Sequence, residues 1–67
     1  MNIADAQKAV DEIRSVSGDP EIAHIKEDDL YRAALTAIAE GMSAEHARAL
    51  AHTVLTTSDI EFPRWHA

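Results

Sequence analysis

Three side chains near the middle of the chain have types and spacing that chemistry could use: His24, Glu27 and Asp28. They stand at i, i+3 and i+4 in a segment that is predicted to be helical, so they share one face of that helix. An imidazole and two carboxylates that converge in this way could ligate a divalent cation, as in helical carboxylate–histidine metal sites. A metal-binding helical protein that uses these three residues is therefore one hypothesis.

Such a metal site draws ligands from several helices, and the rest of the chain supplies no second half. His46 and His52 are six residues apart, so they diverge on a helix, and no Glu-x-x-His pair occurs on a second helix. The favoured interpretation is that His24 is structural and hydrogen-bonds a neighbouring carboxylate or a tail carbonyl. The Tyr31 hydroxyl could act in the same way. We therefore expect no metal and no other cofactor.

Other catalytic arrangements find no support in the sequence. The chain has no cysteine, which excludes a thiol nucleophile and a thiolate metal site. No serine stands in a glycine-flanked elbow, and both glycines, Gly18 and Gly41, are placed where helices should end. A phosphate-cradling loop thus has no candidate. We predict no catalytic residues and a protein that is not an enzyme.

The charge of the chain argues against nucleic acid as a partner. Its formal net charge is −6: residues 1–31 hold eight acids and three bases, and residues 32–67 hold four acids and three bases. Nucleic-acid-binding proteins usually present a basic patch, whereas the six Lys and Arg residues here are scattered. Residues 44–49, the candidate recognition helix of a helix-turn-helix, contain one Arg and no Lys, Asn or Gln.

The sequence also predicts that the protein does not enter a membrane. No apolar run approaches the roughly 18 residues of a membrane span. The N-terminus shows no basic region followed by an apolar stretch, so no secretory signal is expected. We predict a cytoplasmic location, which would be the host cytoplasm if the gene belongs to a phage.

Three helices in one domain must position these residues. Apolar residues at three- and four-residue spacing predict helices over about residues 3–16, 20–40 and 43–57. Asn2 and Asp19 are expected N-caps, and Pro20 suits a first helical position. Gly18 and Gly41 are expected to end the first two helices, Gly18 in the left-handed conformation. The third helix is expected to bury one apolar stripe: Ala47, Leu50, Ala51, Val54 and Leu55.

Residues 58–67 are predicted to form an extended tail. Ile60 and Phe62 alternate with acidic residues, which is typical of extended backbone, and Pro63 disfavours a helix at Phe62. The apolar residues include thirteen alanines, so the core is thin and the only Phe and the only Trp should be needed in it. The predicted fold is a compact all-α three-helix domain with an extended aromatic C-terminal tail packed across the helices.

Two ends of the chain carry a resemblance. One is the segment Asp19-x-Glu21-x-Ala23-His24-x-x-Glu27-Asp28-x-Leu30, followed by Leu35-x-Ala37-Ile38-Ala39-x-Gly41; the other is Phe62-x-Arg64-Trp65-x-Ala67. Together they resemble a group of small uncharacterised bacterial and bacteriophage proteins with an "AHxxEDxL" helix and a C-terminal "RWxA" end. His66 stands where that group would have an aromatic residue. The resemblance implies a phage or prophage context and no activity.

The leading hypothesis is a non-enzymatic phage- or prophage-type accessory protein that binds a host protein. A structural homodimer of unknown role is a further alternative, because small residues repeat at four-residue spacing and let helices approach closely: Ala33 and Ala37, and Ala47 and Ala51. The candidate interaction residues are those of the aromatic end and the tyrosine it could contact: Tyr31, Phe62, Arg64 and Trp65.

A calorimetric titration tests the structural interpretation of His24. We expect Zn²⁺, Mn²⁺ and Ni²⁺ to give the same heats with the wild-type protein and with His24→Ala, because one imidazole and its neighbours make only part of a site. A micromolar site that disappears on this substitution would show that His24 is a ligand.

Overall fold

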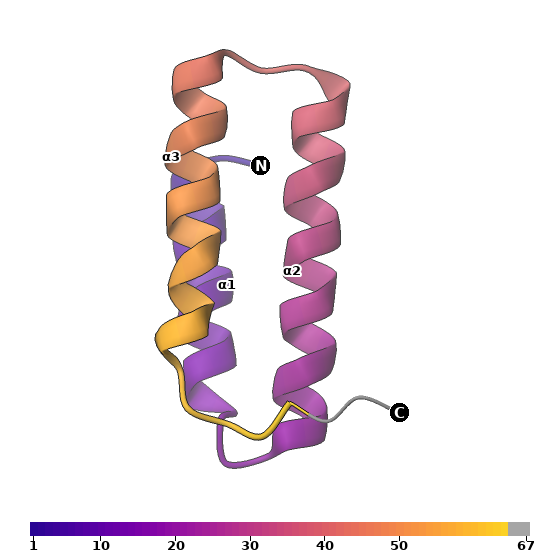
Figure 1. Cartoon of the computed structure of the whole chain (residues 1–67), viewed down its shortest axis with the longest axis vertical. Helices are drawn as coiled ribbons and strands as arrows, with labels where there is room; N and C mark the ends of the chain where they lie inside the picture. The colour runs from indigo at the N-terminus through magenta and orange to yellow at the C-terminus, as the bar shows by residue number, and fades with distance from the viewer. Residues whose placement is uncertain (65–67) are drawn as a thin grey trace.

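Three α-helices and one short 3₁₀ helix make up the fold. A computed structural model describes residues 1–64, with α1 at Ile3–Ser15, α2 at Pro20–Glu40, α3 at Ala44–Leu55 and the 3₁₀ helix η1 at Thr56–Asp59. The helices run up and down beside one another, and α1 lies behind α3 and packs on both other helices (Figure 1). The predicted all-α three-helix fold is confirmed.

The helix starts follow from side chains that the sequence places at them. The Asn2 side chain accepts from the Asp5 N–H at 2.7 Å, and Asp5 accepts in return from the Asn2 N–H, which makes a capping box. The Asp19 side chain accepts from the Ile22 N–H ahead of Pro20. Ser43 caps α3 through the His46 N–H. Each start therefore satisfies donors that a helix leaves unpaired at its first turn.

The prediction for Gly18 is wrong. Among residues 1–64 only Gly41, with φ of 109°, has a positive φ. The first helix instead ends in hydrogen-bonded turns, in which the Val16 N–H donates to Ile13 and Arg14 and the Ser17 N–H donates to Arg14. Because these bonds occupy the last carbonyls, no left-handed residue is required there.

The core is small and lies between the three helices, with the start of the tail closing one end. Ile60 and Phe62 are buried, as their alternation with acidic residues predicts. The extended segment begins later than expected, because η1 continues the helical path to Asp59. The buried apolar residues are Ala6, Val10, Ile13, Ala23, Leu30, Ala34, Leu50, Val54, Ile60 and Phe62.

The prediction that Ala51 and Leu55 are buried is wrong, since both are exposed. Leu50 and Val54 are the buried residues of α3. No helix within residues 1–64 is long and apolar enough to cross a membrane.

Removal of the tail after Thr57 should unfold most of the protein. The deletion takes Ile60 and Phe62 out of the core, and a fully buried apolar side chain of this size contributes roughly 1.5–3 kcal/mol. A domain this small has only about 3–5 kcal/mol of stability in total. Helicity and melting temperature from circular dichroism measure the effect, and Glu61→Ala, at an exposed position, is the control. A truncated protein that melts like the full chain would contradict the prediction.

Candidate functional site

A buried ion pair joins the tail to the second helix. Glu27, on α2, has a side chain only 7% exposed, and Arg64 of the tail reaches it with two hydrogen bonds. The Arg64 Nε donates to Oε1 at 2.9 Å and Nη2 donates to Oε2 at 3.0 Å. This two-point geometry is the strongest form of the arginine–carboxylate contact. Glu27 is the one charged residue in the buried part of residues 1–64.

The same guanidinium also holds the backbone of the tail. It donates to the carbonyl oxygens of Thr57 at 2.9 Å, Ile60 at 3.2 Å and Phe62 at 3.3 Å. Its Cζ lies 3.8 Å from the centre of the Phe62 ring, which is a cation–π contact. We call the group Glu27, Thr57, Phe62 and Arg64 the tail latch, because Arg64 ties the end of η1 and the tail to α2.

Tyr31 extends the latch by one hydrogen bond. Its hydroxyl lies 2.9 Å from the Thr57 hydroxyl, and Thr57 is completely buried. Either hydroxyl can be the donor in this contact. Thr57 also contributes to lowering the pKa of the Glu27 carboxyl. Every polar side-chain atom buried within residues 1–64 has a partner.

The latch keeps Glu27 ionised. Burial acts to raise the pKa of the Glu27 carboxyl, but hydrogen bonds from Arg64 and Thr57 and the positive charge of Arg64 outweigh it, so its pKa lies below the ordinary value. The same pairing raises the pKa of Arg64. The carboxylate is therefore occupied by structural contacts rather than available for proton transfer.

The three candidate metal ligands are not brought together. The His24 Nε2 lies 3.3 Å from Asp28 Oδ2, on the accessible side of α2. Glu27, one residue earlier, points into the protein, where Arg64 occupies both of its oxygens. No group of three or more His, Asp or Glu side chains within residues 1–64 is arranged to hold a metal ion. The structure thus gives His24 the carboxylate partner that its structural interpretation requires.

The candidate interaction residues have different environments. Phe62 is buried and Arg64 is half-buried in the latch, so both serve the fold of this chain directly. Tyr31 is half-buried and also lines a groove between α2 and α3. Trp65 lies outside the described residues. Whether any of the four contacts a partner stays a prediction.

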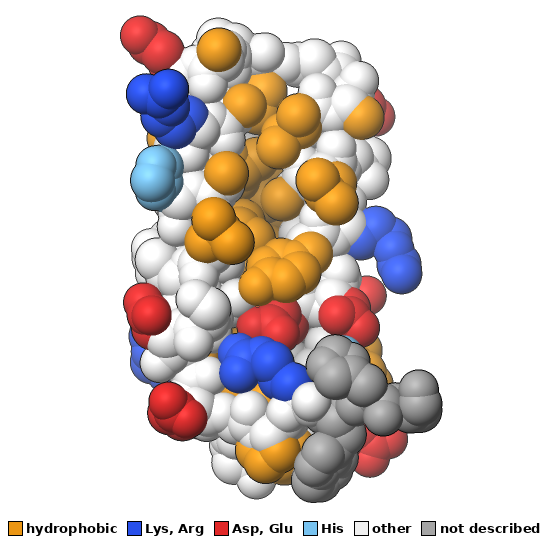
Figure 2. Space-filling view, viewed as in Figure 1, with side chains coloured by type: hydrophobic (Ala, Val, Ile, Leu, Met, Phe, Trp, Pro, Cys, Tyr) orange, Lys and Arg blue, Asp and Glu red, His pale blue; other side chains and the backbone are white. Residues whose placement is uncertain are grey.

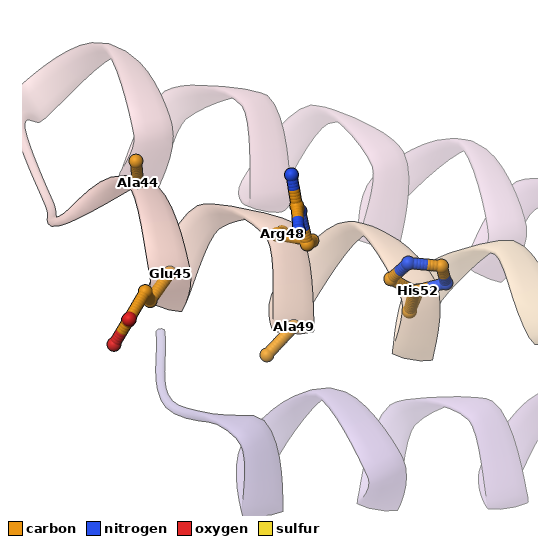
Figure 3. Close-up of a pocket in the computed structure, with 5 residues that line it drawn as sticks. All are labelled: Ala44, Glu45, Arg48, Ala49 and His52. Atoms are coloured by element: carbon orange, nitrogen blue, oxygen red, sulfur yellow. The ribbon is translucent and has the colours of Figure 1, made fainter.

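Two accessible hollows on the surface show no convergent chemistry. The one in Figure 3 lies along the outer side of α3, where Glu45, Arg48 and His52 project in separate directions. A second, of about 410 Å³, lies at the start of α2 and is lined by Pro20, Glu21, His24, Ile25, Asp28 and Pro63. Neither brings a nucleophile and a base into contact.

Large apolar side chains remain exposed at two separate places. At the start of α2, Ile22 is 43% and Ile25 55% exposed, and Ile25 lines a hollow together with Glu21 and Asp28; we call Glu21, Ile22, Ile25 and Asp28 the isoleucine surface. The second place is the apolar patch that runs between α2 and α3 (Figure 2). We call it the α2–α3 face, and it comprises Tyr31, Ala34, Leu35, Ile38, Ala51, Val54 and Leu55.

Comparisons with known proteins add no relative. No protein-family model, curated protein or solved structure matches this chain. The site must therefore be interpreted from its own geometry.

Substitutions in the latch should change how stability depends on pH. The pKa of Glu27 is lowered on folding, so its contribution is fully present above the unfolded value of about 4.3 and is lost as pH falls through the folded value. In Arg64→Met the buried carboxyl has lost its ionic partner, so burial raises its pKa and acidification from pH 7 to 5 should stabilise the variant. In the wild-type protein, Glu27 should not raise the stability on this acidification.

Thermal melts at pH 7 and pH 5 measure this difference. Breaking a buried ion pair costs about 3–5 kcal/mol, and we expect the lower part of that range because the Arg64 side chain is 30% exposed. The double variant Glu27→Gln/Arg64→Met should not gain stability on acidification, because no carboxyl is left at the site. Glu12→Gln, at an exposed carboxyl, is the matched control. If the stability of Arg64→Met and that of wild type respond identically to pH, Arg64 does not stabilise the ionised carboxylate of Glu27.

Proposed function

We propose that this chain is a non-enzymatic interaction protein that binds another protein through its isoleucine surface. The observation that carries the proposal is the exposure of Ile22 and Ile25. The core contains ten buried apolar residues, three of them alanines, yet two isoleucines are left in water on consecutive turns of one helix. Burying these two isoleucines against a partner would stabilise the complex, and this stabilisation is not available to the monomer.

The charges around the isoleucines describe the partner. Glu21 and Asp28 line the same hollow as Ile25, and Asp29 is exposed four residues beyond Ile25. A partner that fits has an apolar centre with Lys or Arg at its rim, which is the usual arrangement of a protein–protein contact. The net charge of −5 on residues 1–31 would steer such a basic partner toward this end of the molecule.

The resemblance to small bacterial and bacteriophage proteins supports a host protein as the partner and a role as a phage- or prophage-type accessory factor. The alternative, a metal-binding protein, has weaker support, because Arg64 occupies both oxygens of Glu27. The isoleucine surface also lies next to the tail, since Pro63 lines its hollow. The "AHxxEDxL" helix and the tail would thus present one continuous surface to a partner.

Site-specific photo-crosslinking tests the proposal. A photoreactive amino acid at position 25 should trap a partner in host cells, whereas the same probe at exposed Lys8 of α1 should not. With the trapped protein purified, Ile25→Arg should weaken binding at least tenfold, which is about 1.4 kcal/mol. Asp28→Asn should weaken it less, and the loss should shrink in high salt. A partner that binds Ile25→Arg as tightly as wild type would sink the proposal, as would equal trapping at position 8.

A further inference from the structure

We infer that the α2–α3 face is the contact between two copies of this chain, which pair around a twofold axis. This inference is independent of the proposed function, because it concerns a different surface. The face is apolar at its centre: Leu35 is 67%, Leu55 60% and Ile38 37% exposed. Every side chain that lines its groove, within residues 1–64, is uncharged.

The face lies on the side of the helix pair that α1 leaves uncovered. The first helix packs behind α2 and α3, while the patch looks out from the front of the same pair (Figures 1 and 2). Three helices in this arrangement correspond to a bundle with one side still open. Helices from a second copy would complete it.

The face carries both the ridges and the groove that such pairing needs. Tyr31, Leu35 and Ile38 follow one another at spacings of four and three along α2, which is the spacing of an interhelical seam. Beside this ridge runs a groove of about 260 Å³, with the small residues Ala34 and Ala51 among its lining. Because an isologous contact uses the same patch on both subunits, a surface that has both features can fit itself.

The face lies on a broad side of the molecule. The Cα trace measures 35 by 23 by 14 Å, and the face occupies the centre of its broad side. An apolar centre within a polar rim is the normal composition of a protein–protein contact.

The distribution of charge permits the pairing despite the −6 of each copy. The segment that builds the face, residues 31–55, contains Arg32 and Arg48 against Glu40 and Glu45, which gives no net charge. The excess of acids lies outside this segment. Repulsion between copies is therefore weak where they would meet.

Sedimentation equilibrium tests the inference on the full chain. Wild type at about 100 µM should have a mean mass close to twice the 7.3 kDa of the monomer, because a dimer with a Kd of roughly 10 µM is mostly associated at that concentration. Leu35→Arg and Leu55→Arg should each be monomeric at that concentration. Ile25→Arg, at a residue 55% exposed on another side of α2, should remain dimeric and is the matched control.

Circular dichroism separates loss of pairing from loss of fold, and the exposed positions of Leu35 and Leu55 should leave helicity intact. If an arginine variant does unfold, Leu35→Ala replaces it and should raise the dimer Kd at least fivefold. A wild-type protein that stays monomeric overturns the inference. So does a dimer that survives both arginine substitutions or that Ile25→Arg dissociates. A host protein that binds monomeric wild type and needs Leu35 would assign the face to that partner instead.

Discussion

One buried carboxylate, Glu27, determines how the rest of this small fold closes. Placed on the inner side of α2, it would be too costly to leave ionised without a partner, because the interior cannot solvate it. The partner is Arg64, thirty-seven residues further along the chain. The tail must therefore return to the start of α2, and it covers the end of the core with Ile60 and Phe62 as it does so.

The latch also explains why the tail can fold without helical structure of its own. The carbonyl oxygens of Ile60 and Phe62 accept from the guanidinium of Arg64, and that of Thr57 accepts from both the guanidinium and the Ile60 N–H. The guanidinium of Arg64 thus donates hydrogen bonds to the helix end, to the extended segment and to the buried carboxylate. Such dense use of a single side chain suits a domain whose core is too thin to hold a tail by burial alone.

Local signals in the sequence predict the helices well, because caps act within three residues. Asn2, Asp19 and Ser43 start their helices as neighbouring residues indicate. Burial was harder to predict, since Leu55 belongs to the same apolar stripe as Val54 and only the position of α1 decides which is covered. The spacing of His24, Glu27 and Asp28 suggested that the three side chains share one face. Neighbouring residues nevertheless point in different directions around the helix axis, so an acid can be buried while the residues next to it are exposed.

The Glu27–Arg64 contact could not be predicted from spacing, because spacing says nothing about contacts between distant segments. A signal existed nevertheless. The two segments that carry the resemblance, around Glu27 and around Arg64, are the two that the ion pair joins.

The second helix ties these observations together. Over its twenty-one residues only Ala23, Glu27, Leu30 and Ala34 are buried. A helix on the surface of a monomer normally has one apolar side, whereas α2 has three: the core stripe, the isoleucines near its start and the Leu35–Ile38 ridge near its end. Ile25 and Leu35 are ten residues apart, or about 15 Å along the axis. One contact could not easily cover both surfaces, so α2 has the pattern of a helix that meets a different neighbour on each side.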